Sequence, residues 1–287
     1  MKKPFPFFIL FLVLTIVSSA QESFRENTVL TEARINEFSP GTKLQYFAGA
    51  CNASQVEVLL TNDPAFDIYS SGVTLSPVMV AIDRFISANN SGNLKSCTEC
   101  LLTIRTIMRD RRYSFKELPS RDKTDLMYIL MKGKTVAATS VPQSGYSGLL
   151  NMMLTELDQK TGFDINYTLS AYMNTAAGNA IGALGVGGTK SSFCTLISRY
   201  PQLKFNLDKR RDVKSYTALM LAVANNNMEM LNALASNGAD FYLVVDGFTN
   251  FPPEELARTL GRADMVTYLN NRRLGNEPAP TTANYCQ

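Results

Sequence analysis

The chain has 287 residues, of which 45% are hydrophobic and 18% are charged, a composition typical of a globular protein rather than a disordered one. Its formal charge is +3. A balance this close to zero gives no indication of the strongly basic surface that binding to nucleic acid requires, so we expect no nucleic-acid partner.

Residues 1–20 have the pattern of a secretion signal. A positive start, Lys2-Lys3, precedes an apolar run over residues 5–17, and Ser18-Ser19-Ala20 offers the small residues that a signal peptidase reads. The run is shorter than the ~20 residues that a membrane span needs. We expect residues 1–20 to be a signal peptide, the mature chain to begin near Gln21 without a membrane span, and the protein to be periplasmic or secreted. The short lysine start favours a bacterial host and hence the periplasm.

Six segments open with a similar helix-forming pattern. In chain order they begin at Thr42, Ser76, Thr124, Asn179, Thr217 and Pro252. The intervals between these starts are longest in the middle, so we place insertions in the second and third repeats, one over residues 87–93 and one over residues 132–148. We expect residues 22–40 to form a polar leading cap. The tail, residues 276–287, is expected to be poorly ordered unless Cys286 ties it down.

The fifth segment carries the clearest pattern. Thr217 can cap the helix that follows it, and residues 225–227 break that helix. Apolar residues then recur at three-residue steps from Met228 to Leu234, which predicts a second helix. Gly238 can supply the left-handed conformation that ends this second helix.

This segment is similar to the ankyrin repeat, whose signature includes Thr-Pro-Leu-His-x-Ala. The sequence from Thr217 to Ala222 has Ala218 in place of Pro and Met220 in place of His, and Gly238-Ala239-Asp240 closes the repeat. The resemblance implies an all-α ankyrin-repeat solenoid of about six degenerate repeats over residues 21–275. An unrelated helical array is the alternative.

The resemblance also implies a surface for binding another protein. In the ankyrin family the variable surface positions lie just before the Thr of the signature and near the end of the first helix. Carried onto this chain, these positions are Lys214, Tyr216, Ala224, Asn225, Phe248, Phe251 and Thr259, with Asn174 and Thr175 in the turn before Asn179. The three aromatic rings would be anchors on exposed turns. The alternative is that they pack onto the neighbouring turn and brace the array.

The chain has five cysteines, so at least one is unpaired within the chain. Cys97 and Cys100 form a C-x-x-C motif on one side of an expected second helix. We expect one of them to form a disulfide bond with a distant cysteine, and Cys51 is a plausible partner because it lies on the neighbouring repeat. A redox role and simple burial are the alternatives for this motif.

No motif predicts an enzyme. The chain has no histidine, which removes the usual general base, the usual zinc ligand and every Ser-His or Cys-His nucleophile. Residues 185–191 resemble a phosphate loop, but Thr189 separates the last glycine from Lys190, so we interpret them as the turn between two helices. We expect no cofactor and no metal. A hydrolase housed in the insertions is the remaining enzymatic alternative.

The exported address and the degenerate repeats are similar to those of exported bacterial ankyrin proteins. These include periplasmic self-protection proteins of predatory bacteria, which bind and inhibit peptidoglycan endopeptidases of the penicillin-binding type. The resemblance implies that this chain binds and inhibits or regulates such an enzyme. The alternative is an accessory of redox or oxidative-stress defence that uses Cys97 and Cys100.

Overall fold

The computed structural model describes residues 32–69, 75–116, 123–136, 145–167, 179–210, 215–244, 252–276 and residue 286. The expected signal peptide, residues 1–20, lies outside these ranges. The chain divides into two compact units, residues 1–39 and residues 40–287. In the first unit the structure describes one short helix, α2 (Glu32–Asn36).

The second unit consists of consecutive helix pairs, which confirms the predicted all-α class for the described residues. The pairs are α3 (Pro40–Gly49) with α4 (Ala53–Asn62), α5 (Pro77–Asn90) with α6 (Leu94–Arg109), α7 (Asp125–Lys132) with α8 (Tyr146–Asp158), α9 (Ala180–Gly187) with α10 (Lys190–Arg199), α11 (Ala218–Ala224) with α12 (Met228–Ser236), and α13 (Pro253–Thr259) with α14 (Ala263–Arg273). Two short 3-10 helices follow α7 and α10, namely η2 (Gly133–Thr135) and η3 (Pro201–Asn206).

Five of the six predicted starts coincide with the residue that precedes a first helix. Ser76, Thr124, Asn179 and Thr217 each accept a hydrogen bond from a backbone N–H in the first turn of α5, α7, α9 or α11. These side chains are buried, with Ser76 and Thr217 fully so. The caps therefore satisfy backbone donors that water cannot reach. Thr42 is different, because α3 begins two residues earlier at Pro40, a residue suited to a first helical turn.

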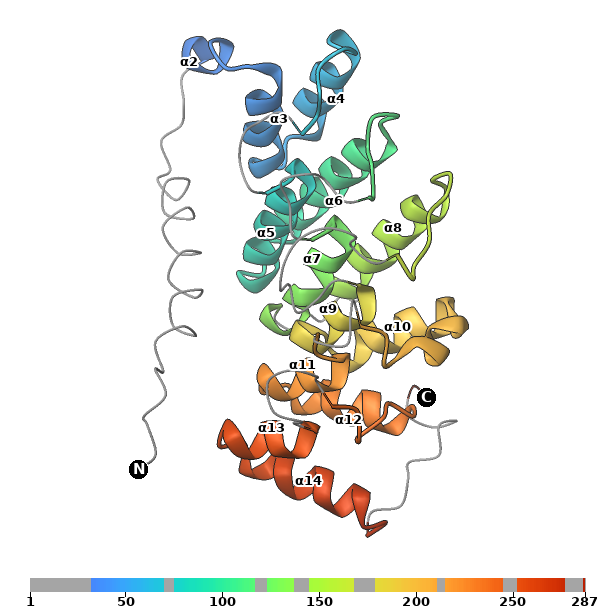
Figure 1. Ribbon diagram of the computed structural model, residues 1–287. Coiled ribbons are helices and arrows are strands. Elements are labelled where there is room, and N and C mark those ends of the chain that lie inside the picture. The colour runs from blue at the N-terminus through green and yellow to red at the C-terminus, as the bar shows by residue number, and fades with distance from the viewer. Residues whose placement is uncertain are drawn as a thin grey trace, which may run out of the picture. The chain divides into compact units, whose positions relative to one another are not determined.

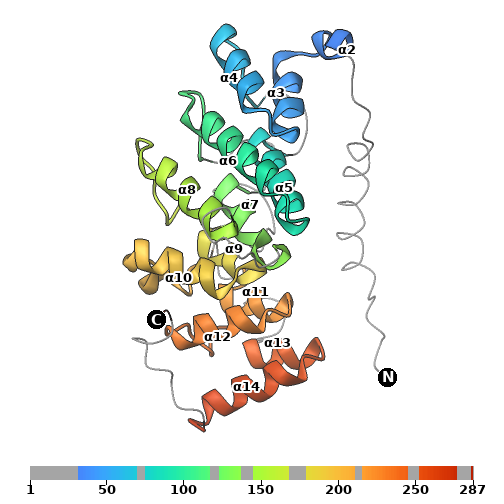
Figure 2. The same cartoon turned by 180° about the vertical axis from the view of Figure 1, so that it is seen from behind.

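The helices of this unit are arranged in two layers. The first helices α3, α5, α7, α9, α11 and α13 contact one another in that order, and the second helices from α4 to α12 do the same (Figures 1 and 2). At the end of the second layer, the Tyr268 hydroxyl of α14 donates to Oδ1 of Asn232 in α12, 2.9 Å away. Each pair thus buries its apolar side chains against its neighbours.

Two segments differ from their expected local structure. The region expected to be a polar insertion at residues 87–93 lengthens α5 and then turns into α6, so that both helices are longer than their counterparts in the later pairs. The supposed turn at residues 185–191 is confined to Gly188 and Thr189. Gly185 and Gly187 instead lie within α9, at points where a Cβ atom would meet the backbones of α11 and α7. The sequence could not reveal this, because the need for glycine arises from neighbouring helices.

Candidate binding surface

The structure places four of the nine proposed contact residues. Tyr216, Ala224, Asn225 and Thr259 belong to the described part of the chain. The other five lie outside it: Lys214, Asn174, Thr175, Phe248 and Phe251.

Tyr216 is presented at the start of α11. Its neighbour Thr217 is fully buried, since it caps the helix, whereas 39% of Tyr216 is exposed. The cap therefore fixes the backbone at this point and leaves the tyrosine accessible to a partner. A tyrosine side chain has only two rotatable bonds before its ring and hydroxyl, so it loses little conformational freedom on binding.

Ala224 and Asn225 lie at the opposite end of α11. Ala224 is half-buried and ends the helix, and the side-chain amide of Asn225 donates to the carbonyl of Leu221, 2.9 Å away. The backbone carbonyl of Asn225 accepts from Nζ of Lys134, 3.4 Å away. Asn225 therefore has a bracing role within the fold, besides its exposed position.

The four residues do not form one cluster. Thr259 is exposed at the end of α13, next to α11 in the first layer, so it lies at the same end of its helix as Asn225. Tyr216 is separated from Asn225 by the length of α11, about 10 Å for a helix of this size. A partner would have to span the helix to contact both.

A polar group that we did not predict from the sequence joins α5 to α7. The hydroxyl of Tyr128 donates to Oδ2 of Asp83, 2.6 Å away, and Nζ of Lys132 lies 3.2 Å from Oδ1 of the same carboxylate. Nζ of Lys132 also lies 4.9 Å from the centroid of the Tyr128 ring. Burial raises the pKa of Tyr128, and the charge of Asp83 raises it further, so the hydroxyl stays protonated and donates.

Contacts between the ends of first helices extend this polar group. The side-chain amide of Asn90 donates to the carbonyl of Thr135 in η2, 2.9 Å away. Lys134, also in η2, reaches the carbonyls of Asn225 and Asn226 at the end of α11. The first layer thus holds polar side chains of α5, η2 and α11 in fixed positions. The spacing of Tyr128 and Lys132, one helical turn apart, was the only signal of this group in the sequence.

No protein-family model matches the chain, and no curated protein matches its sequence significantly.

The predicted disulfide bond between Cys51 and one cysteine of the C-x-x-C motif is confirmed, and that cysteine is Cys100. Cys51, between α3 and α4, is bonded to Cys100 in α6, so the bond links the first two helix pairs. Cys97 is fully buried and is a free thiol, and burial raises its pKa. Both motif cysteines were candidates for the bond, because they lie one turn apart on the same side of α6. The structure therefore holds no Cys97–Cys100 pair.

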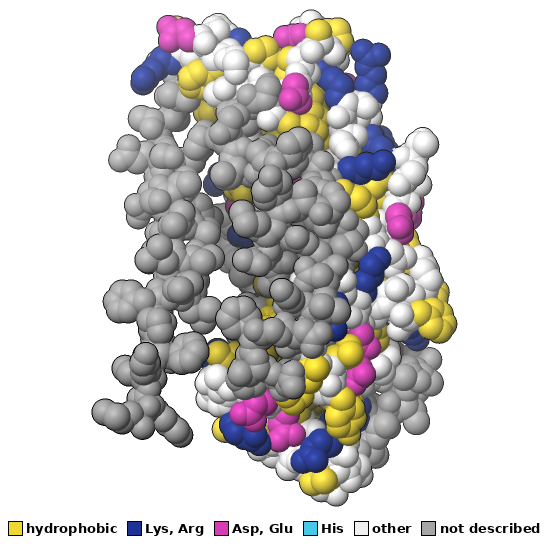
Figure 3. Space-filling view, viewed as in Figure 1, with side chains coloured by type: hydrophobic (Ala, Val, Ile, Leu, Met, Phe, Trp, Pro, Cys, Tyr) yellow, Lys and Arg dark blue, Asp and Glu magenta, His cyan; other side chains and the backbone are white. Residues whose placement is uncertain are grey.

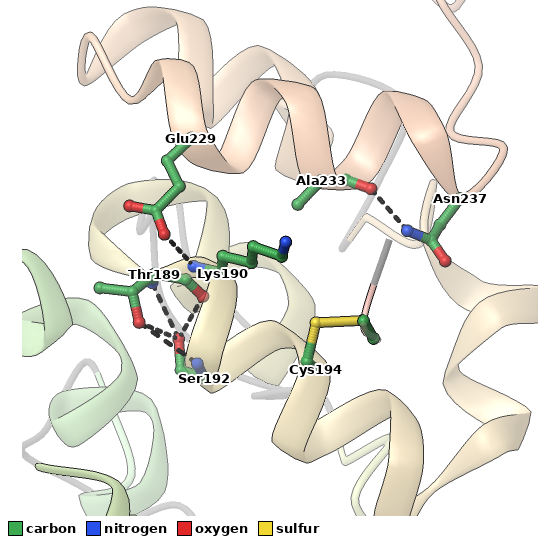
Figure 4. Close-up of a disulfide and its surroundings, with 8 residues drawn as sticks. Thr189, Lys190, Ser192, Cys194, Glu229, Ala233 and Asn237 are labelled. Atoms are coloured by element: carbon green, nitrogen blue, oxygen red, sulfur yellow. Dashed lines mark hydrogen bonds between the residues drawn. A yellow bond between two sulfur atoms is a disulfide. The ribbon is translucent and has the colours of Figure 1, made fainter. Parts of the chain in front are cut away.

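A second disulfide bond joins Cys194 in α10 to Cys286 near the chain end. Figure 4 shows this bond beside α10, with Glu229 and Asn237 of the following pair across from it. The backbone N–H of Lys190 donates to Oε1 of Glu229, 2.6 Å away, which also ties the start of α10 to α12. The sequence had indicated Cys286 as a possible tie for the tail but not its partner.

The described residues show little that could hold a small ligand or a metal. A cavity of about 20 Å³, room for one water molecule, has a mostly apolar lining that includes Tyr113, Phe115, Leu126 and Phe163, with Thr124 and Asp164 among its polar residues. Among the described residues no group of three or more acidic or cysteine side chains could bind a metal ion. The helices of the described segments include none that is both long and apolar enough to cross a bilayer.

Proposed function

We propose that this chain is an ankyrin-type repeat protein that binds another protein through its first-helix layer. The main support is the common register of the first helices: four of them begin with a buried Ser, Thr or Asn cap, and all six are stacked side by side. In a repeat protein each repeat contacts only its neighbours, so the repeats stack in a row. The exposed sides of the first helices then form one extended surface, which a single partner can contact.

The polar contacts within this layer support binding rather than a purely structural role. Asp83 and Lys132 are partly exposed, and they are held in place by each other and by the buried Tyr128. Tyr216 is exposed at the start of α11. Side chains fixed before binding reduce the entropy that association costs. Asp83, Lys132 and Tyr216, together with Asn225 and Thr259, are the contact surface that we propose.

The proposed compartment is the periplasm. Two disulfide bonds, Cys51–Cys100 and Cys194–Cys286, are typical of proteins in oxidising compartments. The signal-like pattern of residues 1–20 agrees with export. N-terminal sequencing of the mature protein should give a start at or near Gln21; a cytoplasmic protein that begins at Met1 would contradict this address.

The proposed partner is a peptidoglycan endopeptidase of the penicillin-binding type, which the chain would inhibit or regulate in a self-protection role. This rests on the resemblance to exported ankyrin proteins that was drawn from the sequence. The redox alternative gains no support, because Cys100 is bonded to Cys51 rather than paired with Cys97.

The test is capture of partners from a periplasmic extract by the purified mature chain, followed by endopeptidase assays with and without the chain. We expect Tyr216→Ala to weaken capture about tenfold or more, because it removes an aromatic anchor. Tyr242→Ala is the matched control: Tyr242 is 63% exposed and lies on the turn after α12, outside the contact surface that we propose.

Equal effects of the two tyrosine variants would show that the start of α11 is not the contact surface. Lys214→Glu and Phe248→Ala extend the test to proposed contact residues outside the described part of the chain. If an endopeptidase is not among the captured proteins and its activity is unchanged, the proposed partner is wrong.

A further inference from the structure

Cationic side chains gather where α6 and α8 end. They are Arg105, Arg109, Arg111, Arg112 and Lys160. The carboxylates that contact these cations are Glu156 and Asp110, so positive charge exceeds negative charge here even though the chain as a whole is close to neutral. Figure 3 shows Lys and Arg side chains along the edge of this view where the ends of the second helices lie.

Glu156 organises the two arginines of α6. Nε of Arg105 lies 2.7 Å from its Oε1, and Nε of Arg109 lies 2.9 Å from its Oε2. The carboxylate side chain is only 2% exposed, whereas the arginine side chains are 45% and 54% exposed. The arginines thus share a buried anchor while their tips remain in solvent.

The tips of these arginines are available for a second ligand. Each donates to Glu156 through Nε, and neither has another hydrogen-bond partner among the residues that the structure describes. The two Nη groups of a guanidinium form a planar fork that matches the two oxygens of a carboxylate. Because both Nε atoms contact one carboxylate, the two forks lie close together and are oriented before a ligand arrives.

Two further cations border these forks. Nζ of Lys160 donates to the backbone carbonyl of Asp110, 3.1 Å away, which places it beside the end of α6. The carboxylate of Asp110 is already bound by Arg112, at 2.7 Å from Nε and 2.8 Å from Nη2. Arg111 is exposed and has no carboxylate bonded to it in the described part of the chain. Its charge therefore adds to that of the forks.

An exposed apolar side chain lies on the same face of α6. Leu102 is 50% exposed, and it precedes Arg105 and Arg109 by three and seven residues, the spacing of one helix face. Apolar surface next to the forks fits a peptide, which has apolar side chains, better than it fits a free inorganic anion.

We propose that Arg105, Arg109 and Arg111 form a second contact surface, which binds an acidic segment of a protein partner through carboxylate pairs on the arginine forks. Leu102 contacts an apolar side chain of the same segment. This inference rests on the proposed role as a protein-binding module and adds a surface on the second-helix layer, away from Tyr216.

The test uses the full mature chain and a short fluorescein-labelled peptide rich in glutamate and leucine, with binding followed by fluorescence anisotropy at low and at physiological salt. Arg105→Lys with Arg109→Lys keeps the charge opposite Glu156 but removes the forks, and we expect affinity to fall about tenfold. Arg111→Glu should weaken binding severalfold and slow association. Lys95→Glu is the matched control, since Lys95 is exposed in the first turn of the same helix, about 20 Å away along its axis.

The peptide with glutamine in place of glutamate should not bind. If the glutamate peptide does not bind, or if Lys95→Glu weakens it as much as Arg111→Glu, the assigned surface is wrong. If inorganic phosphate binds as tightly as the peptide and displaces it, the cluster is a general anion site and the peptide assignment is overturned. Should the double lysine variant fail to fold, Arg109→Lys alone and Arg111→Glu decide the question.

Because the peptide assay does not involve Tyr216, it can fail while capture of a periplasmic partner succeeds. In that case the second surface is wrong and the proposed function stands. Peptide binding with no captured partner would leave the second surface in place and contradict the first.

Discussion

At the scale of single residues, two glycines of α9 allow the neighbouring helices to approach closely. A Cβ atom on Gly187 would overlap the carbonyl oxygen of Met131 in α7, and one on Gly185 would overlap the carbonyl oxygen of Ala218 in α11. Alanine normally stabilises a helix by about 1 kcal/mol relative to glycine. We expect Gly187→Ala instead to lower the free energy of unfolding by about 3 kcal/mol or more, because backbone atoms cannot move aside as a side chain can.

Urea denaturation of both proteins measures this effect. Gly49→Ala in α3 is the control, because its Cβ atom would meet only a side-chain atom of Val80, at 3.1 Å. Its stability should stay within about 1 kcal/mol of wild type. A Gly187→Ala variant as stable as wild type would contradict the close approach of α7 to α9.

At the scale of elements, Glu156 joins α8 to α6. Burial would raise the pKa of Glu156, but the hydrogen bonds and charges of Arg109 and Arg105 outweigh burial and leave the pKa below its ordinary value. We expect Glu156→Gln to lower the free energy of unfolding by about 1–2 kcal/mol at pH 7, since it removes a charge that two arginines contact. The value is modest because both arginines are about half exposed to water.

The pH dependence of this contact has a definite sign. With a pKa lower in the folded state than in the unfolded state, the carboxylate contributes stability above the ordinary carboxyl pKa of about 4.3 and loses it as the pH falls through the folded value. The difference between wild type and Glu156→Gln should therefore be full at pH 7 and shrink below about pH 4. Glu57→Gln, on an exposed site of α4, is the control and should leave the free energy of unfolding at pH 7 close to that of wild type.

At the scale of the second unit, each of the two disulfide bonds joins cysteines that lie far apart in the sequence. Cys51 and Cys100 are separated by 49 residues, and Cys194 and Cys286 by 92. Each bond restricts the unfolded chain, so we expect Cys51→Ser with Cys100→Ser, or Cys194→Ser with Cys286→Ser, to lower the free energy of unfolding by about 2–4 kcal/mol.

Peptide mapping of the non-reduced protein checks the pairing itself. An alkylating reagent should not label the native protein, because Cys97 is buried, and should label Cys97 alone after denaturation without reductant. Cys97→Ser is the control, because this substitution should abolish the labelling and leave both disulfide bonds intact. Labelling of Cys51 or Cys286 in the denatured protein would contradict the bonds.

The sequence by itself determined the helical class and where most first helices begin. A capping residue bonds to N–H groups of the very next turn, so it can be recognised from neighbouring residues in the sequence. The capping residues are Ser76, Thr124, Asn179 and Thr217, and an apolar run follows each of them. The sequence also indicated a disulfide bond that involves Cys97 or Cys100, because both cysteines are local features of one helix.

Only the tertiary structure decided what depends on the approach of distant segments. Cys100 rather than Cys97 is bonded because of where Cys51 meets α6, and a pattern within α6 cannot contain that information. Two side-chain contacts, Tyr128 with Asp83 and Arg105 with Glu156, join residues roughly one repeat apart. Neither pairing can therefore be recognised from a local sequence pattern. Contacts made by packing between helix pairs, and not by periodicity within one pair, determined these sites.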